Sequence, residues 1–197
     1  MPTVPETLRE AVKFLESEPV PYVLIGGLAA GLQGRPRTTE DVDLMIHVSR
    51  ARIPGLARAA KQAGFRVEAE DAELQWLASG FFRMWVGDEG DRVAVDLMTS
   101  NSDFLREIVW RAQLRRFCGL DVHVASPEDL ILLKLMAWRE KDLADIRSTI
   151  HVAGDRLNRE YLERWARWLG EQNDAFVEIP ERLTAVVEGR RGPPAKQ

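Results

Sequence analysis

Two periodicities of apolar residues alternate along the chain and predict a protein built from both helices and strands. Apolar residues three or four positions apart predict helices over residues 5–17, 28–32, 50–63, 127–138, 141–152 and 158–169. Short apolar or alternating runs predict strands over residues 22–25, 41–48, 81–86, 91–98, 114–117 and 120–124. The whole stretch from residue 65 to residue 98 has a β-like pattern.

Capping and turn residues agree with several of these boundaries. Gly64 follows the helix predicted over residues 50–63 in the C-cap position, and Gly-Asp-Glu-Gly at residues 87–90 predicts a hairpin turn. Ser126 precedes a proline and is followed three residues later by Asp129, which is a strong signal for the start of a helix.

The predicted order is helix, strand, helix, strand, helix, several strands and then helices alone, which is typical of an α/β or α+β fold. We expect a sheet domain over residues 1–125 and a helical extension over residues 126–197 that packs on it. The tail from residue 178 is rich in Pro, Gly and Arg, which predicts a frayed end.

Composition excludes several classes of protein. Of the 197 residues, 45% are hydrophobic and 29% are charged, which is ordinary globular usage and argues against disorder. No apolar run approaches the roughly 20 residues that cross a bilayer. The first residues lack the apolar segment of a signal peptide, so we expect a cytoplasmic protein. The single cysteine, Cys118, excludes an intrachain disulfide and a cysteine-cluster zinc site.

The 27 basic and 31 acidic residues give a formal net charge of −4. Contact with nucleic acid would therefore need a local basic patch. Arginines within residues 111–116 and 156–167 could line such a patch, although solvated faces are the simpler interpretation.

Two aspartates occupy one face of a predicted strand. Asp41 and Asp43 project from the same side, about 7 Å apart, while Val42 and Leu44 face the core. Asp96 interrupts another Val-rich strand in the same manner. If the two strands are neighbours, the three carboxylates converge, and their mutual repulsion requires a proton or a cation. Mg²⁺ prefers such hard oxygen ligands together with substrate phosphates. The alternative is a solvated surface pair.

Residues upstream of these aspartates favour phosphate binding. Gly26 and Gly27 follow a strand and open a short helix, so their backbone amides can face a phosphate. Arg37 and Thr39 precede Asp41 at two-residue steps, and an extended chain would direct all three side chains to one side.

This combination resembles the signature of the nucleotidyltransferase superfamily that includes polymerase β. The match is a Gly-Gly pair, a small-residue helix and the pattern R-x-T-x-D-x-D, and it is most similar to the AbiEii-type toxins of the small bacterial branch. Residues 127–146 are similar to that branch's second signature, an early Lys followed by Lys-Asp-x-x-Asp. The resemblance covers about residues 20–150. Many superfamily members have Gly-Ser where this chain has Gly26-Gly27.

The resemblance implies a mixed sheet, with Asp41 and Asp43 as metal ligands, Asp96 as third acid and general base, and Lys134 on the nucleotide phosphates. On a continuous helix, Lys134, Trp138, Lys141 and Asp145 would share one face, which adds Lys141 and Asp145 to the candidate nucleotide-binding residues. The alternative is a solvated Lys134 beside a surface ion pair of Lys141 with Asp145.

The leading hypothesis is a Mg²⁺-dependent nucleotidyltransferase. An acceptor hydroxyl, deprotonated with help from Asp96, would attack the α-phosphorus of an NTP, and two metals would stabilise the attacking and leaving oxygens. The acceptor could be a tRNA end, a protein hydroxyl or a small molecule such as an aminoglycoside. The protein could also be the toxin of a toxin–antitoxin pair, with an antitoxin as partner. Two alternatives are a catalytically silent member that binds nucleotide or a partner protein, and a plain interaction domain.

Overall fold

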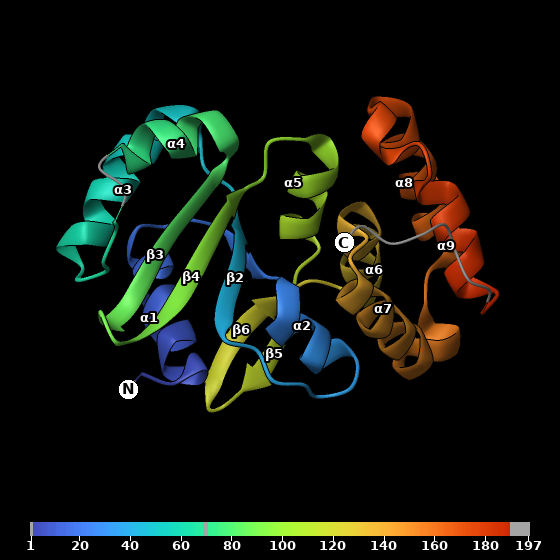
Figure 1. Ribbon diagram of the computed structural model, residues 1–197, viewed down its shortest axis with the longest axis horizontal. Helices are drawn as coiled ribbons and strands as arrows, with labels where there is room; N and C mark the ends of the chain where they lie inside the picture. The colour runs from blue at the N-terminus through green and yellow to red at the C-terminus, as the bar shows by residue number, and fades with distance from the viewer. Residues whose placement is uncertain (1, 69–70, 190–197) are drawn as a thin grey trace. The chain divides into compact units, whose positions relative to one another are not determined.

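Six strands form one mixed sheet in the computed structural model, which describes residues 2–68 and 71–189 (Figure 1). Their order across the sheet is β3–β4–β2–β1–β6–β5. The strands are β1 (Tyr22–Leu24), β2 (Asp41–Ile46), β3 (Phe81–Asp88), β4 (Asp91–Thr99), β5 (Gln113–Phe117) and β6 (Leu120–Val124). The pairs β2–β4 and β1–β6 are parallel and the other three are antiparallel. The predicted α/β class with a mixed sheet is therefore confirmed.

The chain divides into two compact units, Met1–Leu28 with Thr38–Ala125, and Ala29–Arg37 with Ser126–Gln197. The first unit contains the whole sheet, and the second contains the C-terminal helices. The segment Ala29–Arg37 groups with the C-terminal helices.

Amphipathic helices supply the core of the first unit. Its helices are α1 (Val4–Ser17), α3 (Ile53–Gln62), α4 (Ala72–Ser79) and α5 (Asp103–Trp110), and a short 3-10 helix, η1 (Arg50–Arg52), precedes α3. Helix α1 packs against β2 and β4 through a fully buried stripe that includes Leu8, Val12 and Leu15.

The second unit is helical. After α2 (Gly26–Gln33), which crosses the boundary between the units, it contains α6 (Pro127–Ala137), α7 (Glu140–Ala153), η2 (Gly154–Arg156), α8 (Arg159–Gln172), η3 (Asp174–Phe176) and α9 (Ile179–Val187). Ser126 caps α6 as expected, because its Oγ accepts a hydrogen bond from the backbone N–H of Asp129 at 3.2 Å. The Tyr161 hydroxyl donates to Oδ1 of Asp129 at 2.6 Å and joins α8 to α6.

Three helices differ from the sequence-based expectation. Residues 72–79 form α4 inside the stretch with a β-like pattern, so that interpretation was wrong there. Helices α5 and α9 were not predicted. Helix α9 lies in the tail from residue 178 for which a frayed end was predicted, and the end of that tail, residues 190–197, lies outside the described residues. Throughout the described part of the chain, no helix has both the length and the apolar character needed to cross a membrane.

Candidate active site

Three carboxylates converge on one face of the sheet. Strands β2 and β4 are parallel neighbours whose register pairs Asp43 directly with Asp96, and Asp41 lies two residues earlier on the same face. One carboxylate oxygen from each residue lies within 4.8 Å of the other two. Asp96 is buried, and Asp41 and Asp43 are half-buried. The predicted convergence is therefore present.

The alternation of residues along the two strands fixes this orientation. Val42 and Leu44 in β2, and Val95 and Leu97 in β4, are fully buried. Because successive side chains point to opposite faces, burial of these four residues directs the aspartates to the other face. A shift of either strand by one residue would bury a carboxylate in the core.

Arg83 on β3 holds the third acid of the group and was not predicted from the sequence. It is the register partner of Asp96, and its Nε and Nη2 donate to the two carboxylate oxygens at 2.6 Å each. This hydrogen-bonded pair raises the pKa of Arg83 against the opposing effect of desolvation, and the charges of Asp41 and Asp43 add to the increase. The guanidinium therefore neutralises part of the acidic cluster.

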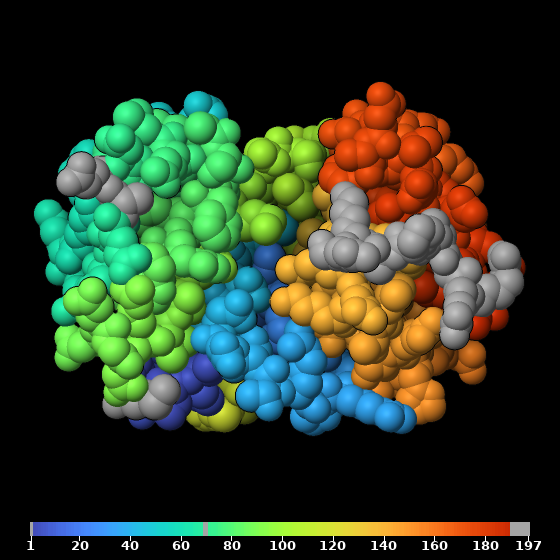
Figure 2. Space-filling model, in the orientation of Figure 1, coloured from blue at the N-terminus to red at the C-terminus, as the bar shows by residue number. Residues whose placement is uncertain are grey.

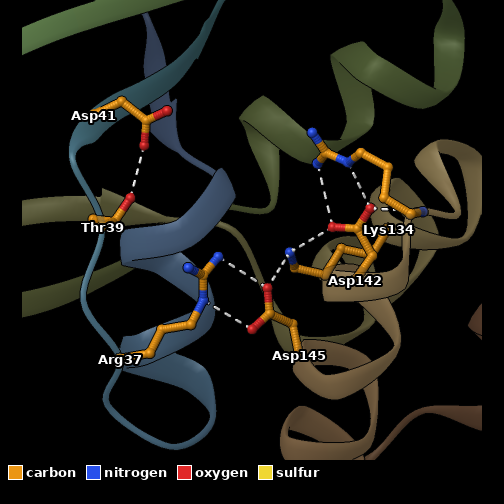
Figure 3. Close-up of polar contacts among 7 residues, drawn as sticks. Arg37, Thr39, Asp41, Lys134, Asp142 and Asp145 are labelled. Carbon is orange, nitrogen blue, oxygen red and sulfur yellow. Dashed lines mark hydrogen bonds and ion pairs between the residues drawn. The ribbon is translucent and has the colours of Figure 1, made fainter. Parts of the chain in front are cut away.

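Asp41 has a hydrogen-bond partner in the residues that lead into β2. The Thr39 hydroxyl donates to Oδ1 of Asp41 at 2.7 Å, so these two candidate residues are in direct contact (Figure 3). The hydrogen bond orients the carboxylate and leaves its second oxygen for another ligand.

Gly26 is the point at which the backbone approaches the acidic cluster. Its φ is +65°, in the left-handed region, and a Cβ at this position would lie 1.9 Å from Oδ2 of Asp43. Both observations require glycine, because any side chain would strain the backbone and collide with the carboxylate. The Gly-Gly pair thus begins α2 immediately after β1, as the sequence predicts, and makes room for Asp43.

Gly26→Ala is expected to displace the Asp43 carboxylate and to lower stability. The strained φ alone costs about 1–2 kcal/mol, and relief of the collision must move Asp43. Urea denaturation would measure the loss. Gly55→Ala in α3 is the matched control, since nothing lies within 4 Å of its Cβ, and this variant should be as stable as the wild type or up to about 1 kcal/mol more stable. Equal stability of both variants would contradict the close approach.

A second polar cluster lies within the second unit (Figure 3). The ammonium of Lys134, on α6, contacts Oδ1 of Asp142 at 3.3 Å and Oδ2 of Asp145 at 2.6 Å. Asp145 also receives a bidentate pair from Arg37, through Nε at 2.9 Å and Nη2 at 3.0 Å. All three of the residues on α6 and α7 are buried, so the charges compensate one another away from water.

The expected continuous helix is interrupted at Trp138, which corrects the predicted shared face. Trp138 has φ +47° and ends α6, and α7 begins two residues later at Glu140. The break lets Lys134 meet Asp145 across two neighbouring helices. Trp138 itself is fully buried and Lys141 is exposed on α7, so neither takes the position that a single helix would give it.

Arg37 also departs from the expected geometry. The two-residue spacing predicted that Arg37, Thr39 and Asp41 would point the same way, but the Arg37 guanidinium pairs with Asp145 of the second unit. The chain between residues 34 and 40 is irregular and contains a proline, so the strict alternation of a strand does not apply there.

The carboxyl of Asp142 is held ionised by its neighbours. Burial raises the pKa of Asp142, but the hydrogen bond from Arg139 and the charge of Lys134 outweigh burial and leave the pKa below its ordinary value of 3.8. The same carboxylate caps α7, because Oδ2 accepts from the backbone N–H of Arg139 at 3.0 Å.

Asp142→Asn is expected to destabilise the protein by about 2–4 kcal/mol at pH 7, because Lys134 loses a buried counter-charge. A depressed folded-state pKa contributes stability above the unfolded pKa, near 3.8, and this contribution disappears as the pH falls through the folded value. The stability difference between wild type and variant should therefore shrink below about pH 4. Denaturant melts at several pH values would measure it, and a pH-independent difference would contradict the account.

The acidic cluster fits a divalent metal. Carboxylate oxygens are hard ligands of the kind that Mg²⁺ prefers, and Arg83 alone cannot balance three negative charges. Lys134 and Arg37, two cationic groups of the second cluster, have the chemistry for binding phosphates.

Comparison with known protein families and structures agrees with this geometry. A model of the family described as "Nucleotidyl transferase of unknown function" (DUF2204) matches residues 4–184. No curated protein is a significant match in sequence.

Several solved structures share the fold. An antigenic nucleotidyltransferase-like protein from Paracoccidioides brasiliensis has 18% identity and a TM-score of 0.53, with 94% of this chain and 93% of that chain covered. The antibiotic-resistance factor ANT(2'')-Ia has 19% identity and a TM-score of 0.51, with coverage of 82% and 92%. The lincosamide antibiotic adenylyltransferase LnuA, solved with lincomycin, has 16% identity and a TM-score of 0.51, with coverage of 74% and 95%.

Proposed function

The chain belongs to the DUF2204 family of nucleotidyl transferases, and from this premise we propose that it moves a nucleoside monophosphate from an NTP to an acceptor hydroxyl with the help of Mg²⁺. The observation that carries the proposal is the convergence of Asp41, Asp43 and Asp96 on one face of the sheet. Neighbouring carboxylates of this kind are costly unless a cation balances them, and a phosphate-bearing substrate would share that cation.

The three acids have different proposed roles. Asp41 and Asp43 would hold the metal together with Asp96, and Thr39 would keep the Asp41 carboxylate oriented through its hydrogen bond. Bound there, Mg²⁺ would neutralise the phosphates and stabilise charge on the attacking and leaving oxygens. Asp96 would also accept the proton of the acceptor hydroxyl. Arg83 occupies one lone pair on each Asp96 oxygen, which leaves others for that purpose.

Nucleotide phosphates are proposed to bind the remaining predicted residues. Gly26 and Gly27 would offer backbone amides at the start of α2, which replaces the serine hydroxyl common in the superfamily. Lys134 and Arg37 would provide cations, with Asp145 keeping both in place. Lys141 is exposed on α7 and would reach only an outlying phosphate.

The acceptor and the biological role are further proposals. ANT(2'')-Ia has been solved with adenylyl-2''-tobramycin, and LnuA with lincomycin, so two proteins of this fold act on antibiotics. A small-molecule hydroxyl is one candidate acceptor here, beside a tRNA end or a protein hydroxyl. Membership of the AbiEii-type branch, a toxin role with an antitoxin and a cytoplasmic location stay predictions from the sequence.

Label transfer tests the proposal. The protein is incubated with each α-labelled NTP, Mg²⁺ and either total RNA or total protein from cells, and with antibiotics of the aminoglycoside and lincosamide classes. The proposal expects Mg²⁺-dependent label on one acceptor class. Thermal shift with each NTP separates the alternatives, because a ligand at a hundredfold excess over Kd stabilises by about 2.7 kcal/mol. A shift without transfer would identify a silent nucleotide-binding member, and no shift would contradict both nucleotide hypotheses.

A further inference from the structure

A groove in the second unit is lined by cationic side chains. It has a volume of about 420 Å³ and lies between the loop of residues 35–37 and helix α7. In Figure 2 the blue atoms of this part of the chain lie beside the orange atoms of α7. Its lining residues are Arg35, Pro36, Arg37, Ala144, Asp145, Arg147, Ser148 and His151, and we name it the arginine groove.

The two walls of the groove are held together by defined contacts. The backbone N–H of Arg35 donates to Oγ of Ser148 at 2.7 Å, and Arg37 pairs with Asp145. Gly34 also approaches Ser148, since a Cβ there would lie 2.8 Å from Oγ. The loop is therefore fixed against α7, and the groove is a preformed feature.

The charges of the groove are unbalanced toward positive. Asp145 is the one acid among its lining residues, and it is already compensated by Arg37 and by Lys134 beneath it. Arg35 and Arg147 are exposed, and neither forms an ion pair within the described residues. His151 adds an imidazole one turn after Arg147. This concentration of positive charge stands out on a chain whose formal net charge is −4.

The chemistry of the lining selects a class of ligand. Guanidinium groups form paired hydrogen bonds with phosphate oxygens. In this groove they come from both walls, the loop of residues 35–37 and helix α7. Charges spread over a loop and two turns of a helix suit a chain of phosphates better than one phosphate group. No Trp, Tyr or Phe lines the groove, so it has no ring on which a base could stack. A polycationic acceptor such as an aminoglycoside would be repelled.

We propose that the arginine groove binds the phosphodiester backbone of a nucleic-acid strand without reading its sequence. If the chain is a nucleotidyltransferase, as proposed above, the strand bound in the groove would be the acceptor, and its end would receive the nucleotide. Backbone contacts position a strand and carry no sequence information, so bases would remain free to be selected elsewhere.

Fluorescence anisotropy with short labelled strands tests the groove by itself. The full chain is titrated into a fluorescein-labelled single-stranded RNA, and separately into DNA of the same sequence, in EDTA and without NTP. The double variant Arg35→Glu/Arg147→Glu removes both unpaired cations and leaves Arg37 unchanged. Arg167→Glu is the control for charge reversal away from the groove, because this arginine is exposed on α8 of the same unit.

The wild type and Arg167→Glu should bind alike, and the double variant should bind at least tenfold more weakly. Loss of two phosphate contacts should also reduce the slope of log K against log[salt] by about 1.4, because each contact to a single strand contributes about 0.7. Binding of RNA alone, DNA alone or both would support the groove and identify the strand. Absence of binding, or equal weakening by Arg167→Glu, would overturn it.

Failure of the groove and failure of the proposed function give different results. If the protein binds strands through the groove but transfers no label from any NTP, the proposal for the groove stands and the proposed transferase activity is wrong. If the protein transfers label to a small molecule, but substitution of Arg35 and Arg147 does not weaken strand binding, the proposed transferase activity stands and the proposal for the groove is wrong.

Discussion

Asp41→Asn and Asp43→Asn are each expected to abolish nucleotidyl transfer while the first unit remains folded. The amide keeps the size of the side chain but removes a negative ligand, and a thousandfold loss corresponds to about 4 kcal/mol of lost transition-state stabilisation. Like charges 4 Å apart repel by about 4 kcal/mol at an effective dielectric constant of 20, so removing one relieves repulsion. In metal-free buffer the free energy of unfolding should therefore stay the same or rise.

Initial rates of label transfer and urea denaturation in EDTA measure the two effects. Asp155→Asn is the control, because this aspartate is exposed and lies outside both clusters. It should change neither quantity. Full activity in Asp41→Asn would remove that residue from the mechanism, and unfolding of the variant would show that the cluster is structural.

Lys134→Met is expected to destabilise the protein by about 3–5 kcal/mol. The variant keeps an unbranched side chain of similar length but leaves the buried Asp142 and Asp145 without the ammonium that contacts both. Arg37 would still pair with Asp145 and Arg139 with Asp142, so each carboxylate would keep one cationic partner and lose the other. Denaturation in urea measures the loss.

A second substitution separates charge from packing. In Lys134→Met/Asp142→Asn one of the two carboxylates that Lys134 contacts is gone, so part of the lost stability should return and the two changes should be non-additive by more than about 1 kcal/mol. Lys61→Met, at an exposed position on α3, is the control and should be nearly neutral. Additive effects of the two substitutions would contradict the coupling between Lys134 and Asp142.

The acidic cluster could be predicted because its signal is local. Two aspartates separated by one residue must share a face of a strand, and Asp96 repeats the pattern in a second Val-rich strand. The prediction had to assume only that the two strands are neighbours in the sheet. The structure shows that β2 and β4 are neighbours and that Asp43 pairs with Asp96. Gly26 was identified for the same reason, since it follows a strand and precedes a helix.

The partners of these residues could not be predicted, because they depend on register and on chain breaks. Arg83 reaches Asp96 only through the pairing of β3 with β4, and its sequence context is an ordinary exposed strand position. The left-handed conformation of Trp138 turns α6 into α7, and no glycine or proline marks that turn. Arg37 meets Asp145 across 108 residues of sequence. Such contacts are decided by tertiary packing.

Uptake of Mn²⁺, followed by the loss of the free-ion electron paramagnetic resonance signal, tests most directly whether the three acids form a metal site. In the absence of NTP, which would itself bind the ion, the wild type should withdraw Mn²⁺ from solution, and Mg²⁺ should compete for the same site. Asp43→Asn and Asp96→Asn should bind the ion at least tenfold more weakly than Asp155→Asn does. Equal uptake by all of these proteins would contradict the account.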